Sequence, residues 1–483
     1  MGDMNLSRRA FLAATTTTAT LTFTGAAAQP NTAQVVPGKV SPNEKLNVAA
    51  IGAGGKGLSD IMAAGRTENI VALCDVDWKK AEEAFYNVPN AKQFKDFRNM
   101  LEQMPEIDAL TISTPDHMHA PAAYMAMKLG KGVYVQKPMT HTVAEARLLA
   151  NVAREMGVAS QMGNQGHSGD GVRDLCEMVW SGAVGAVKEA HVWTHRPVWA
   201  NQGRAEAFPG MVQPELMDWD RWLGPAPYRP YNPAYAPHDW RAWQDFGGGS
   251  LGDMACHIMD PIYWSLKLGE ATDYTVEVVG QKGRNDQTFP IASTIKYSFP
   301  ARADMPAVDV YWYDGHWTEE QASIGDPFPD AVLVARNDGP PEYRNRPKRP
   351  EGVPATSILG DDEWNGSFIV GETGIITSGE YGGQSRLVPD ERMTGYVRPP
   401  QTIPRIPNQD HNADWIRACK GGEPACSNFS YSGPFTEMVN FGNLVVKSGQ
   451  KLRWDNVKGV VMDHPQAAQI VSKEYRKGWE LPC

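Results

Sequence analysis

Apolar and polar residues follow two different patterns along this chain, and the change falls near residue 165. Between residues 46 and 163, short apolar runs alternate with segments whose apolar positions recur at helical spacing. The expected strands span 48–51, 70–73, 109–113, 132–135 and 159–163, and the expected helices span 58–66, 79–87, 97–103, 119–129 and 143–157. Because strands that alternate with helices form parallel sheets with helices on both faces, residues 45–163 are predicted to form a Rossmann domain with a doubly wound parallel sheet.

The pattern after residue 165 indicates a different architecture. An amphipathic helix is expected over 170–181, and a long segment rich in Trp and Pro extends to about residue 243. Strands are expected over 187–194, 274–280, 293–298, 308–313, 367–370 and 374–377. Strands that follow one another without intervening helices favour antiparallel pairing. Residues 164–483 are therefore predicted to form an α+β domain with a large, mostly antiparallel sheet, whose C-terminal helices could pack back on the first domain.

A glycine-rich stretch, Gly52–Gly57, lies between the first expected strand and the first expected helix. Its G-x-G-x-x-G spacing in a strand-turn-helix setting is typical of a dinucleotide site. Gly52 would make the tight turn, Gly54 would admit the pyrophosphate, and Gly57 would let the helix pack close to the strand. The alternative is a glycine-rich turn that binds no ligand.

An acid follows the second expected strand, where such units bind the ribose hydroxyls. This residue is Asp75, which stands 18 positions after Gly57. A carboxylate there repels a 2′-phosphate, so NAD is predicted over NADP. Lys56 and Lys79 lie close in sequence and weigh against that preference.

The first 44 residues are predicted to direct export and are not expected to be part of the folded domains. Ser7-Arg8-Arg9, a weakly apolar stretch and an Ala-rich end at Ala28 predict a twin-arginine signal peptide over 1–28, followed by a linker or arm over 29–44. The twin-arginine export machinery carries folded proteins, so we expect a periplasmic protein that leaves the cytoplasm with its nucleotide bound. Free NAD is scarce in a periplasm, and the cofactor should therefore be held tightly and recycled in the site.

Composition and charge exclude several classes of protein. The net charge of −10 and the lack of a basic run interleaved with aromatics argue against a nucleic-acid partner. No later segment is long and apolar enough to predict a membrane span. Six scattered cysteines lack metal-ligand spacing, so no metal site is predicted. Cys419 and Cys426 could pair in an oxidising compartment or remain free thiols.

Polar residues follow the expected strand 109–113, at the sheet edge where the nicotinamide half of a dinucleotide binds. Thr114 and Pro115 belong to this turn, and His117 and His119 come directly after it. Either histidine could contact the cofactor, or it could cap the helix that begins there.

Together with the next strand, these motifs carry a family resemblance. The glycine turn, Asp75, the S-T-P-D-H-x-H run and Val135-Gln136-Lys137-Pro138 resemble the glucose-fructose oxidoreductase, inositol dehydrogenase and rhizopine-catabolism family (Gfo/Idh/MocA), and the leader resembles its exported subgroup. The resemblance implies that Lys137 lies beside the nicotinamide and the reacting hydroxyl. Gln136 stands where the family usually has glutamate, which leaves Lys137 with one fewer anionic neighbour. The resemblance further implies that the open face of the second sheet forms a homodimer or homotetramer contact.

A second informative stretch is Gly247–Asp260. Asp253, His257 and Asp260 are spaced i, i+4 and i+7, which places them on one helix face. Spacing alone allows a metal site, a structural histidine with two acids, or a catalytic group. The resemblance favours catalysis, with His257 as general base, Lys137 and Asp253 positioning the hydroxyl, and Asp260 in support.

Polar and aromatic residues on expected strand ends and loops complete the candidate site. Several tryptophans lie among polar residues, as they do in sugar-binding clefts. The predicted cofactor contacts are Gly52, Gly54, Gly55, Lys56, Gly57, Asp75, Thr114, Pro115, His119, Lys137 and Gln165. The predicted substrate contacts are Lys137, Asn164, Trp193, His195, Arg196, Trp240, Arg241, Asp253 and His257.

These features predict an oxidoreductase that retains NAD(H) and oxidises a secondary hydroxyl of a sugar, glycoside or polyol. One alternative is a redox-neutral glycosidase or lyase that oxidises its sugar transiently. Another is a sugar-binding protein that keeps the nucleotide as a structural group.

Overall fold

The computed structural model describes residues 44–322, 327–335, 340–361, 364–462, 464 and 470–483. The predicted signal peptide and most of the predicted linker lie outside the described residues. Within the described part of the chain, helices long and apolar enough to cross a membrane are absent.

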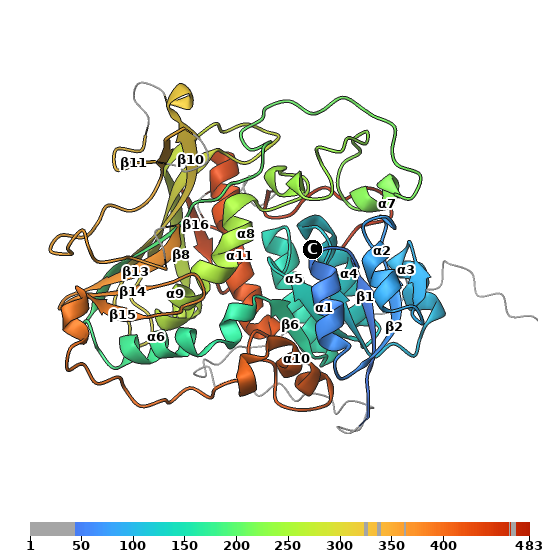
Figure 1. Ribbon diagram of the computed structural model, residues 1–483, viewed down its shortest axis with the longest axis horizontal. Helices are drawn as coiled ribbons and strands as arrows, with labels where there is room; N and C mark the ends of the chain where they lie inside the picture. The colour runs from blue at the N-terminus through green and yellow to red at the C-terminus, as the bar shows by residue number, and fades with distance from the viewer. Residues whose placement is uncertain (1–43, 323–326, 336–339, 362–363, 463, 465–469) are drawn as a thin grey trace, which may run out of the picture. The chain divides into compact units, whose positions relative to one another are not determined.

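The first sheet has six strands in the order β3-β2-β1-β4-β5-β6 (Figure 1). Its strands are β1 (Asn47–Ile51), β2 (Asn69–Cys74), β3 (Lys92–Phe94), β4 (Ala109–Ile112), β5 (Gly132–Gln136) and β6 (Ser160–Gly163). All neighbouring pairs are parallel, which confirms the predicted doubly wound sheet. Sequence reasoning missed β3, because this edge strand has two exposed polar residues in three and so lacks an apolar run.

Helices connect these strands, and local capping explains their ends. They are α1 (Lys56–Ala64), α2 (Glu82–Asn87), α3 (Phe97–Gln103), α4 (Asp116–Lys128) and α5 (Val143–Met156). Thr142 and Glu145 form a reciprocal capping box at the start of α5, and Gly157 ends it in the left-handed conformation. The helix expected from residue 79 begins only at Glu82, because the Asp77 side chain accepts a hydrogen bond from the Lys80 backbone and holds a turn there.

The second sheet follows the order β15-β14-β13-β7-β10-β9-β8-β16-β17, with β11 and β12 extending from β10. Its strands are β7 (Val187–Thr194), β8 (Asp273–Lys282), β9 (Ala292–Phe299), β10 (Val308–Thr318), β11 (Val332–Val334), β12 (Glu342–Arg344), β13 (Asn365–Gly371), β14 (Ile375–Ser378), β15 (Arg386–Val388), β16 (Leu452–Asp455) and β17 (Val460–Val461). Only the pairing of β7 with β10 is parallel among the described strands of this sheet. The predicted mostly antiparallel sheet is thereby confirmed.

Helices cover one face of this sheet and connect it with the first one (Figure 1). They are α6 (Asp170–Trp180), α8 (Gly249–Ile258), α9 (Asp260–Ser265), α10 (His411–Cys419) and α11 (Phe429–Ser448). The long helix α11 packs against α5 and α8, and an Arg147–Glu437 ion pair of 2.6 Å joins it to α5. The catalytic candidates on α8 are therefore held between the two sheets by buried helical packing.

The segment between β7 and α8 forms its own aromatic core around α7 (Trp219–Leu223). Trp199 and Trp243 are two of the tryptophans that lie among polar residues in the sequence, as tryptophans do in sugar-binding clefts. Both are buried in this cluster. Its edge pairs with the first domain, since Met217 bridges Asp77 and the Trp78 amide donates to the Leu216 carbonyl. The segment thus covers the chain that follows β2.

Candidate functional site

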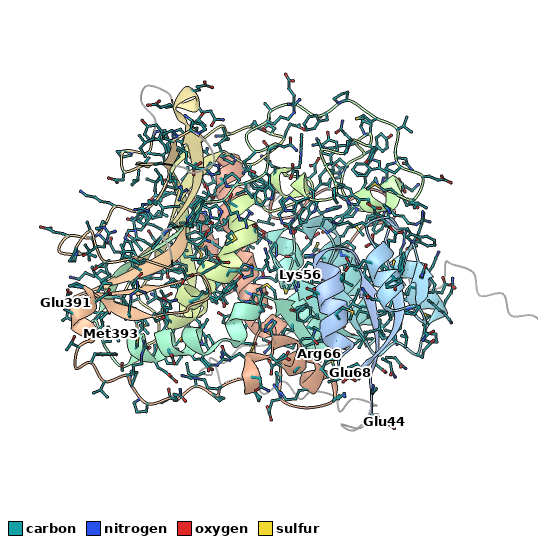
Figure 2. All side chains as sticks on the ribbon, viewed as in Figure 1. Glu44, Lys56, Arg66, Glu68, Glu391 and Met393 are labelled. Atoms are coloured by element: carbon teal, nitrogen blue, oxygen red, sulfur yellow. The ribbon has the colours of Figure 1, made fainter. Side chains whose placement is uncertain are left out.

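A cavity of about 460 Å³ begins at the glycine turn and ends at His257. The carboxyl ends of β1, β2, β4 and β5 line one side of it, where open parallel sheets bind their ligands. The segment that covers β2 lines the opposite side through Trp222, Trp240 and Arg241. Figure 2 shows Lys56, at the cavity end of α1, and Arg66 near opposite ends of that helix.

The glycine turn has the close contacts that require glycine. Gly52 has a φ of +83°, and a Cβ there would lie 2.6 Å from the Ser113 carbonyl oxygen. A Cβ at Gly57 would lie 2.0 Å from the Gly52 oxygen. Gly55 and Lys56 line the cavity where α1 begins, so backbone N–H groups without helical partners are available to an anion. This cradle fits the pyrophosphate of a dinucleotide.

Asp75 has a structural role as well as a place in the cavity lining. Its carboxylate accepts hydrogen bonds from the amides of Ala53 at 2.8 Å, Gly54 at 3.1 Å and Asp77 at 2.9 Å. Burial raises its pKa, and these amides partly offset that rise. Asp75 therefore holds the glycine turn in place and also lines the cavity.

The lysine near Asp75 is Lys80 rather than Lys79. Lys79 is exposed and pairs with Glu82. Lys80 lines the cavity, and its Cγ lies 2.6 Å from the position of a Cβ at Gly54. The sequence analysis named Lys79 instead, because the turn at Asp77, which decides which of the two adjacent lysines faces the cavity, could not be seen in the sequence.

The predicted cofactor contacts beyond the turn have different surroundings. Thr114, Pro115 and Gln165 line the cavity, and the Thr114 hydroxyl is buried with no hydrogen-bond partner among the described residues. His119 does not line it. Its two ring nitrogens lie 2.8 Å from the Pro138 carbonyl oxygen and 2.9 Å from that of Thr114, and burial lowers its pKa to about 4. His119 therefore ties α4 to the end of β5.

Gln136, the departure from the family motif, contacts a buried carboxylate. Its amide nitrogen donates to Asp60 Oδ2 at 2.8 Å, and the Ser113 hydroxyl donates to the same oxygen at 2.8 Å. Asp60 is 3% exposed and also pairs with Lys56 on its own helix. One carboxylate thereby joins α1 to the ends of β4 and β5, next to Lys137.

Lys137 and Asp253 form the centre of the predicted catalytic site. The Lys137 ammonium donates to Asp253 Oδ1 at 2.7 Å and to the Asp253 carbonyl oxygen at 2.6 Å. Arg241 Nε donates to the same carboxylate at 3.2 Å, and Arg196 Nε lies 3.7 Å from it. Burial alone would raise the pKa of Asp253, but Lys137 and the two arginines hold it well below its usual range.

His257 lies one helical turn beyond Asp253 on α8, at the end of the cavity. Its Nδ1 is buried and has no hydrogen-bond partner among the described residues. Burial, reinforced by the charge of Lys137, lowers the pKa of the imidazole to about 3. The ring is therefore neutral near pH 7 and can accept a proton.

Asp260 differs from the expectation that it shares a helix face with Asp253 and His257. Helix α8 ends at Ile258, and Asp260 begins the separate helix α9. Its two carboxylate oxygens lie 2.8 Å from His167 Nδ1 and 2.6 Å from the Tyr431 hydroxyl that donates to it. The carboxylate of Asp260 thus contacts His167 and Tyr431.

The remaining predicted substrate residues separate into two groups. Trp240 and Arg241 line the cavity. Trp193 is buried in an apolar cluster with Phe368, and the Asn164 side chain accepts a 2.6 Å hydrogen bond from the Ser427 hydroxyl. Asn164, Trp193, His195 and Arg196 are not among the residues that line the described cavity.

Three residues that the sequence did not single out adjoin the site. Asp116, the first residue of α4, accepts a 2.9 Å hydrogen bond from the Gly248 amide, and burial raises its pKa to about 7. The Tyr381 ring meets the His257 ring edge-on at 5.0 Å. Trp479, near the C-terminus, lines the cavity beside Phe97. Only Asp116 had a local signal, since it stands inside the S-T-P-D-H-x-H run.

No group of three or more His, Cys, Asp or Glu side chains that could hold a metal ion occurs within the described ranges. All six cysteines are free thiols, including Cys419 and Cys426, for which a disulfide was one of two alternatives.

Known proteins share this chain's sequence over parts of its length. An uncharacterized oxidoreductase, sll0816, of Synechocystis sp. is 25% identical over 293 residues, which cover 58% of this chain and 69% of that protein. A glycosyl hydrolase family 109 protein of Shewanella sp. strain MR-4 is 30% identical over 171 residues, or 31% of this chain and 37% of that protein. The levoglucosan dehydrogenase of Pseudarthrobacter phenanthrenivorans is 24% identical over 166 residues, or 34% of each chain. The matches with the latter two thus span little more than a third of those proteins.

Solved structures share the fold. The WlbA dehydrogenase from Bordetella pertussis, in complex with NADH and UDP-GlcNAcA, superposes with a TM-score of 0.54 at 14% identity and covers 84% of this chain and 98% of that one. GenD2 from gentamicin A biosynthesis, in complex with NAD, superposes with a TM-score of 0.52 at 16% identity, with coverage of 89% and 99%.

Two models of one oxidoreductase family match successive parts of the sequence. The NAD-binding Rossmann fold of the family matches residues 46–164, and its C-terminal alpha/beta domain matches residues 170–303. The chain belongs to the Gfo/Idh/MocA family of NAD-dependent oxidoreductases.

Proposed function

We propose that this protein oxidises a secondary hydroxyl of a sugar, glycoside or polyol to a keto-sugar and keeps its NAD bound through the reaction. The observation that carries the proposal is a single cavity with a dinucleotide cradle at one end and His257 at the other, where Lys137 pairs with Asp253. The names of two relatives, a levoglucosan dehydrogenase and a glycosyl hydrolase family 109 protein, support a carbohydrate substrate.

The side chains divide the work of oxidation between them. Bound NAD supplies the hydride acceptor. Neutral His257, which lines the cavity, takes the hydroxyl proton, since burial and the charge of Lys137 keep the pKa of its ring low and the ring unprotonated. Lys137, held in place by Asp253, donates a hydrogen bond to the reacting oxygen. Asp253 stays ionised and fixes the ammonium in that position.

Retention of the cofactor is supported by what encloses the cavity. Trp222 and Trp479 line the end that contains Asp75. Arg98 stacks on the Trp479 ring at 4.3 Å, and Arg476 donates to Asp220 at 2.7 Å, so the C-terminal segment 470–483 is fastened at two points. We propose that the exported protein carries NAD through the twin-arginine pathway, as the leader at residues 1–28 suggests. A trapped cofactor then requires either a second carbonyl substrate or a reaction that returns the electrons.

The second candidate is a glycosidase that works by transient oxidation. The 30% identity over 171 residues to a glycosyl hydrolase family 109 protein favours it. With His257 and Lys137 in the same roles, a ring carbon would lose its hydride to the cofactor, and the neighbouring carbon would then lose a proton as the aglycone leaves. Water would add to the resulting double bond before the hydride returns to the keto group. This reaction is redox-neutral and suits a trapped cofactor equally well.

One experiment separates the two candidates. Purified protein, without added NAD, is incubated with glycosides deuterated at individual ring carbons, and the products are followed by mass spectrometry. For the oxidoreductase we expect one equivalent of keto-sugar per site, which rises when a carbonyl acceptor is added. Free aglycone with deuterium lost to solvent beside the oxidised carbon would instead identify the glycosidase. Many turnovers driven by free NAD alone would refute cofactor retention.

The residue assignments are tested in the same assay. Lys137→Ala and His257→Ala should each lower turnover by about 10² or more, the usual scale for loss of general acid-base catalysis. Nicotinamide released by acid quenching should remain stoichiometric in both variants. Near wild-type turnover of either variant would refute its role.

A further inference from the structure

Positive charge exceeds negative charge at the catalytic end of the cavity. Three cations, Lys137, Arg196 and Arg241, surround one carboxylate, that of Asp253. That carboxylate is 9% exposed, while the two arginine side chains are 30% and 27% exposed. Both arginine side chains are therefore partly exposed, and that of Arg241 lines the cavity, whereas Asp253 is enclosed by its partners.

The other acids nearby do not balance this charge. Burial raises the pKa of Asp116 to about 7, so its carboxyl carries only part of a negative charge at neutral pH. Glu380 accepts a hydrogen bond of 3.0 Å from the Asn365 side-chain nitrogen, which leaves its charge in place, so it offsets at most one of the three cations. Lys56, the remaining lysine of the cavity wall near His257, already pairs with Asp60.

Arg241 is placed to hold a planar anion in the cavity. Arg241 stacks its guanidinium on the Trp240 ring at 4.2 Å and uses only Nε to reach Asp253, so its terminal nitrogens have no recorded acceptor among the described residues. Arg196 Nε is buried and faces Asp253 at 3.7 Å, so this arginine contributes charge beside the site. Guanidinium groups pair with carboxylates through two parallel hydrogen bonds.

We propose that the substrate carries a carboxylate, so that the sugar oxidised is a sugar acid such as a uronic acid glycoside. Arg241, which lines the cavity, binds this carboxylate beside the hydroxyl held by Lys137, and Arg196, which faces the other oxygen of Asp253, adds positive charge nearby. The inference rests on the proposed function and names its substrate class. A neutral sugar would leave the two guanidinium groups with solvent as their only additional partner.

The test compares matched pairs of glycosides that differ only at C6. Methyl glucopyranoside, galactopyranoside and mannopyranoside are each paired with the corresponding methyl glycuronoside. Keto-sugar formation and bound NADH absorbance give kcat/KM, and calorimetry gives the affinity whether or not a ligand is oxidised. We expect the acid of at least one pair to be preferred about 10- to 100-fold, the range of one charge-assisted pairing, and the preference to shrink as salt is raised.

Variants show which groups carry the preference. Arg241→Met should lower the acid-to-neutral ratio about tenfold or more, and Arg196→Met, which removes a nearby charge but no direct contact, should lower it less. Arg204→Met is the matched control, because Arg204 also stacks on a ring, that of Phe208 at 4.1 Å, without lining the cavity. It should leave the ratio unchanged.

Each unfavourable outcome has its own meaning. Equal kcat/KM and equal affinity within every pair would overturn the carboxylate while leaving sugar oxidation intact. Loss of bound NAD in Arg241→Met with an unchanged ratio would assign that arginine to the cofactor and overturn the proposal as well. If no compound of any pair is oxidised, the proposed function fails, and the calorimetric preference alone then decides whether the site takes an acid.

Discussion

At the scale of single residues, Gln136 shows how a departure from a family motif can be compensated. A glutamate at this position would place a second carboxylate 2.8 Å from Asp60, where the amide nitrogen of Gln136 now donates a hydrogen bond. Two carboxylates so close cannot both ionise without cost. The chain keeps one buried negative charge at this junction, but on α1 rather than on β5.

Because of this contact with Asp60, we predict that a Gln136→Glu variant is less stable than the parent protein. We expect its free energy of unfolding at pH 8 to fall by about 1–3 kcal/mol, because a buried hydrogen bond is replaced by repulsion. The deficit should shrink as pH falls, since the pKa of the new carboxyl is raised in the folded state and protonation restores a donor. Urea unfolding at pH 8 and pH 5 measures both effects.

The matched control for this variant is the reciprocal exchange. Asp60→Asn combined with Gln136→Glu retains one carboxylate and one amide, so it should recover most of the stability at pH 8. If the single variant Gln136→Glu were as stable as the parent protein at pH 8, the proposed contact would not be energetically important.

At the scale of elements, the C-terminal segment 470–483 closes a cavity that the first domain alone would leave open. Trp479 contacts the Phe97 ring at 6.1 Å between centroids and stacks with Arg98. Because the segment has little secondary structure, its attachment depends on these side chains and on Arg476. An element of this kind can open without unfolding either sheet.

Removal of the Trp479 ring should therefore accelerate cofactor loss. For Trp479→Ala we expect NADH to dissociate roughly tenfold faster, in line with the loss of one aromatic contact, with little change in Tm. Release is followed by the decay of NADH fluorescence after dilution. Trp180→Ala is the control, because Trp180 is also partly exposed and lies near a cation, Lys267, but does not line the cavity. Equal release from both variants would argue against closure by this segment.

At the scale of the whole molecule, many histidines are buried in neutral form. Burial lowers the pKa of five of them, to about 3 for His117 and His257 and to about 4 for His119, His195 and His411. The unfolded chain would bind protons at these positions from about pH 6.5 downwards. Two carboxyls with large shifts act in the opposite sense, since burial raises the pKa of Asp116 to about 7 and of Asp314 to about 6, and burial also raises the pKa of Asp75.

Because the histidines with a lowered pKa outnumber the carboxyls with a raised pKa, we predict that mild acid lowers the stability of the fold. The histidine contribution to stability is complete above pH 6.5 and is lost as pH falls toward 3, because the unfolded state then binds more protons. The two carboxyls are protonated in the folded state and favour it as pH falls through the same range, but they are fewer. We expect the free energy of unfolding to decrease between pH 6.5 and pH 4, with net proton uptake. Calorimetry in buffers of different ionisation enthalpy measures that uptake, and net proton release would contradict the prediction.

The sequence by itself determined the local part of this protein. Strand-turn-helix order, glycine spacing and the acid after β2 depend on neighbours within about 30 residues, and the structure confirms the sheet that they predict. The catalytic candidates Lys137, Asp253 and His257 also stand in short motifs, but it was the resemblance of those motifs to a family, not their spacing, that gave them a role. Periodicity also located most strands of the second sheet, since alternation reports which face of a strand is buried.

Tertiary structure alone decided what surrounds those motifs. Trp193 and Trp240 look alike in sequence, yet one is buried in an apolar cluster and the other lines the cavity. Tyr381 and Trp479 reach the site from more than 120 and 220 residues beyond His257, a separation that no local pattern encodes. The arginine pair around Asp253 likewise exists only because the segment after β7 folds over the sheet edge. Local hydrogen bonding and burial leave a signature in sequence, whereas the partner of a side chain depends on how distant elements pack.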